Sequence, residues 1–122
     1  MSKHDATFSA LIRARDKDIC QRCGGPGGDT HHVNSCHSQG TRYEPDNCLC
    51  LCRICHDLWG VRLSRECKEF MIRRLGKERW GEVVFMARNV KQWEESELDE
   101  KAKGWKEETK RLRQTGCIGG KV

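Results

Sequence analysis

The chain has 122 residues, of which 36% are hydrophobic and 34% are charged. This length suits one domain with a small core. No apolar run approaches the roughly 20 residues that a membrane-spanning helix requires, and the first residues lack the apolar segment of a secretory signal. These features argue against a membrane protein and a secreted protein, and we expect a cytoplasmic location.

The formal net charge of +5 is concentrated in one segment. Residues 1–60 contain seven basic and seven acidic residues, residues 61–90 contain eight and four, and residues 91–122 contain eight and seven. Segment 61–90 is therefore the candidate surface for a polyanion such as DNA. A helical face that is charged only because it is solvated would produce the same counts, so both interpretations stay open.

Hydrophobic spacing predicts a short N-terminal helix and then a turn-rich segment. Residues 5–16 repeat apolar positions at intervals of three or four, and Asp5 is the expected cap. The glycine-rich run 24–28 favours a tight reversal, residues 30–33 a short strand, and residues 34–46 a loop. The stripe on the predicted helix consists of Phe8, Leu11, Ile12 and Arg15.

Three more helices are predicted toward the C-terminus. Gly76 ends the first of them, and the second follows directly. Residues 91–115 form a strongly charged third candidate that Gly104 weakens, and with few large apolar groups it is expected to pack loosely or against a partner. Residues 116–122 are expected to form a flexible tail. The two apolar stripes are Cys67, Phe70, Met71 and Leu75, and then Trp80, Val83, Val84, Ala87 and Val90.

Two Cys-x2-Cys pairs are the strongest structural signal in the sequence. They are Cys20 with Cys23 and Cys52 with Cys55. Two residues between the cysteines let one tight turn direct both sulfur atoms at one ion, and two such pairs complete the four-thiolate tetrahedron that structural Zn²⁺ prefers. Such a site would add stability that a small core lacks.

The nine cysteines allow other interpretations besides a zinc site. A disulfide framework is disfavoured by the odd number and the missing signal, and a thioredoxin-like pair lacks its βαβ context. Cys48 or Cys50 would compete for the metal site, but the x2 spacing favours Cys52. A redox or metal-handling protein is a further hypothesis. Cys36, Cys67 and Cys117 have no obvious partner and are interpreted as small hydrophobic residues or free thiols.

A closed four-thiolate site cannot activate water, so catalysis would need other residues. His31 and His32 are adjacent on the expected strand and point to opposite sides, and His56 directly follows Cys55. The joint pattern is His31-His32-Val33, thirteen residues, Asn47, and then Cys52-x2-Cys55-His56. His37 is interpreted as a solvated loop residue in preference to an additional ligand.

This pattern resembles the HNH endonucleases, the ββα-metal group. That family reads as a paired His or Asp-His, then Asn, then a final His, often with two flanking Cys-x2-Cys pairs. The resemblance covers residues 18–60. Segment 41–47, Thr-Arg-Tyr-Glu-Pro-Asp-Asn, and less specifically segment 70–78, are also similar to the phage NinG/Rap-type recombination nucleases. The resemblance implies a phage-encoded protein that acts in a bacterial host in recombination or packaging.

The resemblance also implies a role for each matching residue. His32 would be the general base that deprotonates water, since its ordinary pKa near ~6.5 suits proton uptake at neutral pH. Asn47 would hold His32 or its loop by hydrogen bonds. His31 and His56 would bind one divalent ion, Mg²⁺ or Mn²⁺, although an imidazole favours a softer ion than Mg²⁺.

Other positions extend this pattern or depart from it. Arg42 would contact a phosphate, or else form an ion pair with Glu44 or Asp46. Many relatives carry another His one helical turn after the final His, where this chain has Gly60. Cys36 lies where the phage relatives tend to be basic.

Together these observations predict one α+β domain over residues 1–122. It would contain an N-terminal helical segment (5–19), a zinc-stapled HNH core (20–60) whose helix begins near Cys52–His56, a helical extension (61–115) and the tail (116–122). The predicted function is a metal-dependent DNA endonuclease with a structural Zn²⁺ and a catalytic Mg²⁺ or Mn²⁺, and branched or recombination DNA is a candidate substrate. The alternative is a non-catalytic, zinc-dependent nucleic-acid-binding module that uses the basic segment.

Overall fold

The computed structural model describes residues 2–35, 38–60 and 65–121, with side chains through residue 114. It is a small α+β arrangement of helices around a two-stranded sheet, as the sequence predicts. No helix among the described residues is long and apolar enough to cross a membrane. In chain order the elements are α1 (Lys3–Arg15), β1 (Asp29–His32), the 3₁₀ turn η1 (Pro45–Asn47), β2 (Cys48–Leu51), α2 (Arg53–Gly60), α3 (Arg65–Leu75), α4 (Lys77–Ala87) and α5 (Glu95–Lys121).

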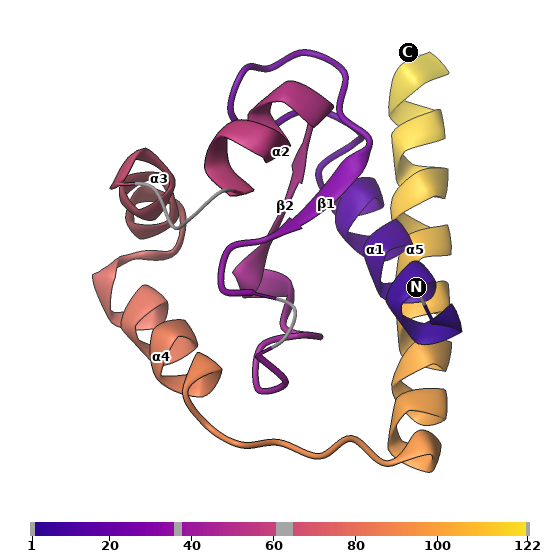
Figure 1. Ribbon diagram of the computed structural model, residues 1–122. Helices are drawn as coiled ribbons and strands as arrows, with labels where there is room; N and C mark the ends of the chain where they lie inside the picture. Colours follow the sequence, from indigo (N-terminus) through magenta and orange to yellow (C-terminus); the bar gives the residue numbers. More distant parts are fainter. Residues whose placement is uncertain (1, 36–37, 61–64, 122) are drawn as a thin grey trace.

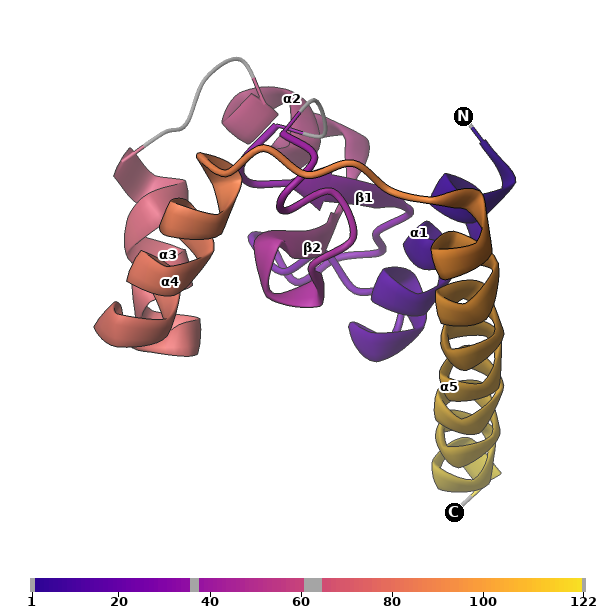
Figure 2. The ribbon, with the colours of Figure 1, turned by 90° about the horizontal axis from the view of Figure 1, so that it is seen from below.

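The antiparallel hairpin of β1 and β2 lies at the centre of the molecule (Figure 1). Its register places Asp29 opposite Leu51 and His32 opposite Cys48. In both views α1 and α5 lie side by side on one flank of the hairpin, and α3 and α4 lie on the other (Figures 1 and 2). All four residues of β2 are buried, so this strand reads as a continuous apolar run with no alternation.

Apolar side chains form two clusters. The larger one combines β2 and α2 with α3 and α4, and the smaller one joins α1 to α5. In the smaller cluster the Phe8 and Trp105 ring centroids are 5.2 Å apart. Helix α5 therefore packs against α1 in the same chain. The buried members of the larger cluster are Cys20, Val33, Leu49, Leu51, Cys55, Trp59, Cys67, Met71, Trp80 and Val83.

Helix α1 begins before the position that the sequence indicated, because Ser2 is its cap. The Ser2 hydroxyl accepts a hydrogen bond from the Asp5 backbone N–H at 3.2 Å. The Asp5 carboxylate accepts in return from the Ser2 backbone N–H at 3.3 Å, which completes a capping box. The prediction that Asp5 is the cap was therefore wrong, since Asp5 is the third residue of the helix.

The predicted start of α2 and the predicted end of α3 agree with the structure. Helix α2 begins at Arg53, within the segment where the core helix was expected. Gly76 separates α3 from α4 with φ of 89°, a conformation that glycine adopts without steric cost. Val90 does not belong to the α4 stripe, because the helix ends at Ala87 and Val90 is 95% exposed.

Helix α5 differs more from the sequence prediction. It begins at Glu95, passes through Gly104 and continues to Lys121, so it includes most of the segment expected as a flexible tail at 116–122. Both prolines of the chain lie at or before Pro45, so every residue of this segment has a backbone N–H for the helical ladder. Packing of the first half against α1 offsets the cost of the internal glycine.

Candidate functional site

Four cysteine sulfur atoms meet between the turn at Cys20–Cys23 (the first cysteine turn) and the start of α2 at Cys52–Cys55 (the second cysteine turn). All four Sγ atoms lie within 4.8 Å of one another, and those of Cys23 and Cys52 are 3.9 Å apart. A zinc tetrahedron with bonds of about 2.3 Å separates its sulfur atoms by about 3.8 Å. The cluster therefore fits a metal ion such as zinc, as the spacing predicts.

Each cysteine turn is held by its own backbone. The N–H of Cys23 donates to Cys20 Sγ at 3.5 Å, and the N–H of Cys55 donates to Cys52 Sγ at 3.4 Å. Burial alone would raise the pKa of Cys20, but backbone donors outweigh it and lower that pKa to about 6. Burial raises the pKa of Cys55 to about 12, even though the Arg22 guanidinium donates to its Sγ.

The other cysteines lie outside this cluster. Cys48 and Cys50 are buried in β2, and burial raises the pKa of Cys50 to about 11. Cys67 is buried in the larger apolar cluster, as a small hydrophobic residue would be. No disulfide joins the cysteines whose side chains the structure describes. Cys36 and the side chain of Cys117 lie outside the described residues.

Two of the predicted site histidines meet between β1 and α2. The rings of His31 and His56 are perpendicular, with centroids 5.0 Å apart. Burial, reinforced by the neighbouring imidazoles, lowers the pKa of His31 to about 4, so its ring is neutral at pH 7, as a metal ligand must be. Nδ1 of His56 is buried and has no hydrogen-bond partner among the described residues.

The ring of His32 lies against α1 and the loop that precedes β2. Its ring centroid is 6.2 Å from that of Phe8, and its Nε2 is 2.9 Å from the carbonyl oxygen of Arg42. Because a carbonyl only accepts, Nε2 must carry the proton and Nδ1 keeps the lone pair. Burial lowers the pKa of His32, so this neutral tautomer dominates at neutral pH. The ring is thus in the form that a general base requires.

Asn47 is fully buried and holds the loop between the strands. Its Oδ1 accepts from the backbone N–H and the side-chain amide of Asn34, both at 2.9 Å. Its Nδ2 donates to the carbonyls of Asn34 at 3.0 Å and Thr41 at 3.3 Å. Since Arg42 follows Thr41, these bonds fix the carbonyl that holds His32. Asn47 was predicted to hold either His32 or its loop, and its hydrogen bonds are to the loop.

The side chain of Arg42 has a different partner from those predicted. Its Nε donates to the Asp5 carboxylate at 2.9 Å, and this ion pair is the main reason that the pKa of Asp5 is strongly lowered. The carboxylates of Glu44 and Asp46, the partners that the sequence suggested for Arg42, both accept hydrogen bonds from Arg79 of α4. The phosphate contact of Arg42 stays a prediction, and its ion pair with Asp5 competes with it.

The space one helical turn after His56 is open. A Cβ added to Gly60 would lie 4.0 Å from Cε1 of His31, so a side chain there would face the imidazole pair. Among the residues that the structure describes, position 60 therefore supplies no third ligand to the pair. His37 lies outside the described residues.

The sequence reasoning missed the buried carboxylate of Asp16, whose side chain is 3% exposed. It accepts from the backbone N–H of Cys50 at 2.9 Å and from Arg15 and Arg74, both at 3.0 Å. Burial would raise the pKa of Asp16, but these donors outweigh it and lower the pKa. Asp16 thus joins the end of α1 to β2 and α3. No local motif marks it, because Cys50 and Arg74 are 34 and 58 residues away.

Comparison of this chain with protein-family models, curated proteins and solved structures finds no match.

Proposed function

We propose that this protein is a metal-dependent DNA endonuclease of the ββα-metal type. In this proposal the four cysteines hold a structural ion, and the imidazole pair holds a second ion that takes part in cleavage. The observation that carries the proposal is the convergence of His31 with His56, whose buried Nδ1 has no partner among the described residues. His32, the next residue of β1 after His31, supports the proposal, because its neutral ring is held by the backbone carbonyl of Arg42.

We expect the imidazole pair to bind a divalent ion. His31 and His56 would hold Mg²⁺ or Mn²⁺, and the bound ion would stabilise the negative charge that develops on the phosphate and the leaving oxygen. Two imidazoles with no carboxylate favour an ion softer than Mg²⁺. We therefore expect Mn²⁺ to support more activity than Mg²⁺.

The remaining chemistry would come from His32 and its supports. Nδ1 of His32 would take the proton from the attacking water. The ring would then be cationic, and its Nε2–H would still donate to the Arg42 carbonyl, whose dipole favours that charge. Asn47 would keep this carbonyl in place through its bonds to the loop.

Cleavage of supercoiled plasmid and of labelled linear, flap and four-way-junction DNA, each with Mg²⁺, Mn²⁺ or Co²⁺, tests this function. The branched substrates test the similarity to phage recombination nucleases. We expect His32→Ala to lower the cleavage rate by about 10²–10⁴-fold. His4→Ala is the matched control, because His4 is also buried but contacts Glu95 and Asp99 of α5. Equal rates for the wild type and His32→Ala would refute the role of His32.

The same experiment separates the endonuclease from the alternative function. A non-catalytic nucleic-acid-binding module would bind DNA in a salt-sensitive way and cleave none of these substrates with any of the ions. Part of its support is Arg73, which lies in the basic segment and is exposed. Because His31 and His56 would have no function in such a module, we prefer the endonuclease.

A further inference from the structure

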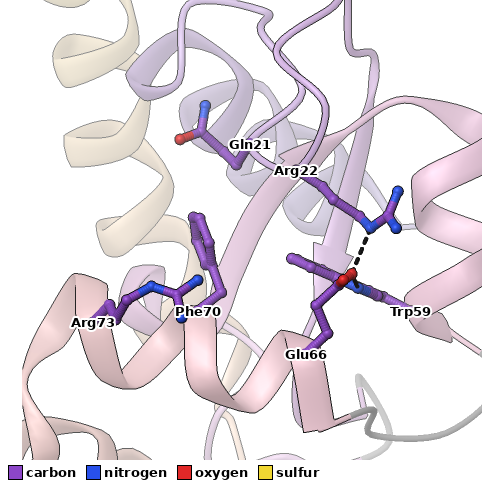
Figure 3. Close-up of a pocket in the computed structure, with 6 residues that line it drawn as sticks. All are labelled: Gln21, Arg22, Trp59, Glu66, Phe70 and Arg73. Atoms are coloured by element: carbon purple, nitrogen blue, oxygen red, sulfur yellow. Dashed lines mark hydrogen bonds and ion pairs between the residues drawn. The ribbon is translucent and has the colours of Figure 1, made fainter.

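Arg22 lies inside the first cysteine turn, between Cys20 and Cys23, and faces a hollow of about 470 Å³ (Figure 3). It is held there from two directions. Its Nε donates to the Glu66 carboxylate at 2.6 Å, and its guanidinium carbon lies 5.9 Å from the centre of the Trp59 ring. The residues that line the hollow are Gln21, Arg22, Trp59, Glu66, Phe70 and Arg73.

The Glu66 carboxylate holds the Arg22 guanidinium next to the Trp59 ring. It accepts from Nε1 of Trp59 at 2.7 Å as well as from Arg22, as the dashed lines of Figure 3 show. Trp59 comes from α2 and Glu66 from α3, so the clamp joins the first cysteine turn to both helices. Charge-assisted bonds of this kind are short and directional. The guanidinium therefore has one preferred position.

In that position the guanidinium also reaches the metal centre. Its terminal nitrogen donates to Cys55 Sγ at 3.5 Å. Cys55 is 2% exposed and lies in the larger apolar cluster, where a thiolate is costly unless a cation or a donor faces it. A divalent ion held by four thiolates leaves a net negative charge, so a fixed positive group at this sulfur favours the bound state.

We propose that Arg22 tunes the affinity of the four-cysteine centre for its metal ion without binding the ion. Held by Glu66 and Trp59, it supplies a positive charge and a hydrogen bond to the Cys55 sulfur. This inference rests on the cysteine centre alone and holds whether or not the protein is a nuclease.

Arg53 provides a matched control in the second cysteine turn. It lies between Cys52 and Cys55 and carries the same charge. Its side chain is 75% exposed and pairs with Asp29 at 3.5 Å and Asp57 at 3.4 Å. Removal of either arginine changes the net charge equally, but only Arg22 donates to a sulfur of the centre.

The experiment measures Zn²⁺ affinity of the full chain by competition with a chromophoric chelator. We expect Arg22→Gln to weaken binding by about 10–100-fold, the usual effect of losing a group that orients a metal ligand. Arg53→Gln should weaken it by less than about fivefold, as expected for an exposed charge. Arg22→Lys keeps the charge but loses the planar fork, so an intermediate loss of about tenfold is expected.

Two further measurements exclude a general loss of structure. The absorption spectrum of the Co²⁺-substituted variants should keep the bands of a four-thiolate site. In excess chelator Arg22→Gln should unfold only slightly more easily than wild type, because it loses an exposed ion pair with Glu66. If Arg22→Gln does not fold, the comparison is made with Arg22→Lys. Equal losses for the Arg22 and Arg53 variants, or unchanged affinity in both Arg22 variants, would overturn the proposal.

Discussion

Replacement of Asn47 by alanine should be among the most damaging single changes in the hairpin. The side chain is fully buried and makes four hydrogen bonds of 2.9–3.3 Å to Asn34 and Thr41. Alanine can neither accept nor donate any of them. The substitution therefore leaves the Thr41 carbonyl without this donor in a fully buried place, together with two partly buried backbone groups of Asn34.

The size of the effect follows from the burial of the abandoned groups. A buried polar group left unsatisfied costs about 1–3 kcal/mol, and partly buried groups cost less because water can reach them. We therefore expect Asn47→Ala to lower the free energy of unfolding by about 3–5 kcal/mol, against a total stability of about 5–15 kcal/mol for a typical domain. Asn34→Ala is the control, because it removes only one of the four bonds and should cost about 1 kcal/mol.

Urea denaturation followed by circular dichroism, with zinc at the same concentration throughout, measures both variants. The dependence of unfolding on urea should stay the same, so that the midpoints report stability directly. A loss below 1 kcal/mol for Asn47→Ala, or equal losses for the two variants, would show that the Asn47 side chain does not hold the loop.

Other changes test the metal centre, the packing of the loop and the titration of the imidazole pair. Cys52→Ser should unfold more easily than wild type and be insensitive to chelator, whereas chelator should lower the wild type to the level of the variant; a chelator-sensitive variant would contradict this. Gly40→Ala should lower the free energy of unfolding by about 1–3 kcal/mol, because its Cβ would lie 2.1 Å from the Met86 carbonyl oxygen. Gly81→Ala within α4 is the control: its Cβ meets nothing within 4 Å, so the change should be neutral or stabilising. Urea midpoints measure both variants, and equal midpoints would contradict this prediction. The pKa of His31 is lowered to about 4, so between pH 6.5 and 4 only the unfolded chain takes up this proton. Without added divalent ions, the free energy of unfolding should therefore be highest above pH 6.5 and fall by roughly 3 kcal/mol as the pH decreases from 6.5 to 4. His31→Gln should flatten this part of the pH profile. An unchanged profile would show that His31 is not the residue whose protonation lowers the stability.

The local elements could be predicted from sequence because their signals are short-range. The stripe on α3 and the glycine that follows it specify a helix and its end within a dozen residues. The packing of α5 on α1 could not be predicted, since it depends on contacts such as Phe8 with Trp105 that span most of the chain. The charge pattern of α5 does not show which partner its few apolar residues meet.

The site shows the same division. Cysteine spacing predicted the four-sulfur cluster because each Cys-x2-Cys turn is local, and a four-thiolate site needs two such turns around one ion. The partner of His32 could not be predicted, because it is a backbone carbonyl, which every residue carries. The contact of Arg42 with Asp5 could not be predicted, because proximity in sequence favoured Glu44 and only the fold brings Asp5 to Arg42 and Arg79 to Glu44.

The basic segment shows why a net charge does not identify a binding surface. Two of its arginines are used inside the fold: Arg74 donates to the buried Asp16, and Arg79 holds the loop before β2. By contrast, Lys68, Arg73, Lys77 and Arg88 are exposed and form no ion pair with the residues that the structure describes. If DNA binds here, these four residues are the candidates for phosphate contacts. Removal of each contact should reduce the slope of log affinity against log salt concentration by about one. Substitution of Arg79 would instead weaken the loop that holds His32. We therefore expect it to lower the free energy of unfolding and to leave the salt dependence of DNA binding nearly unchanged.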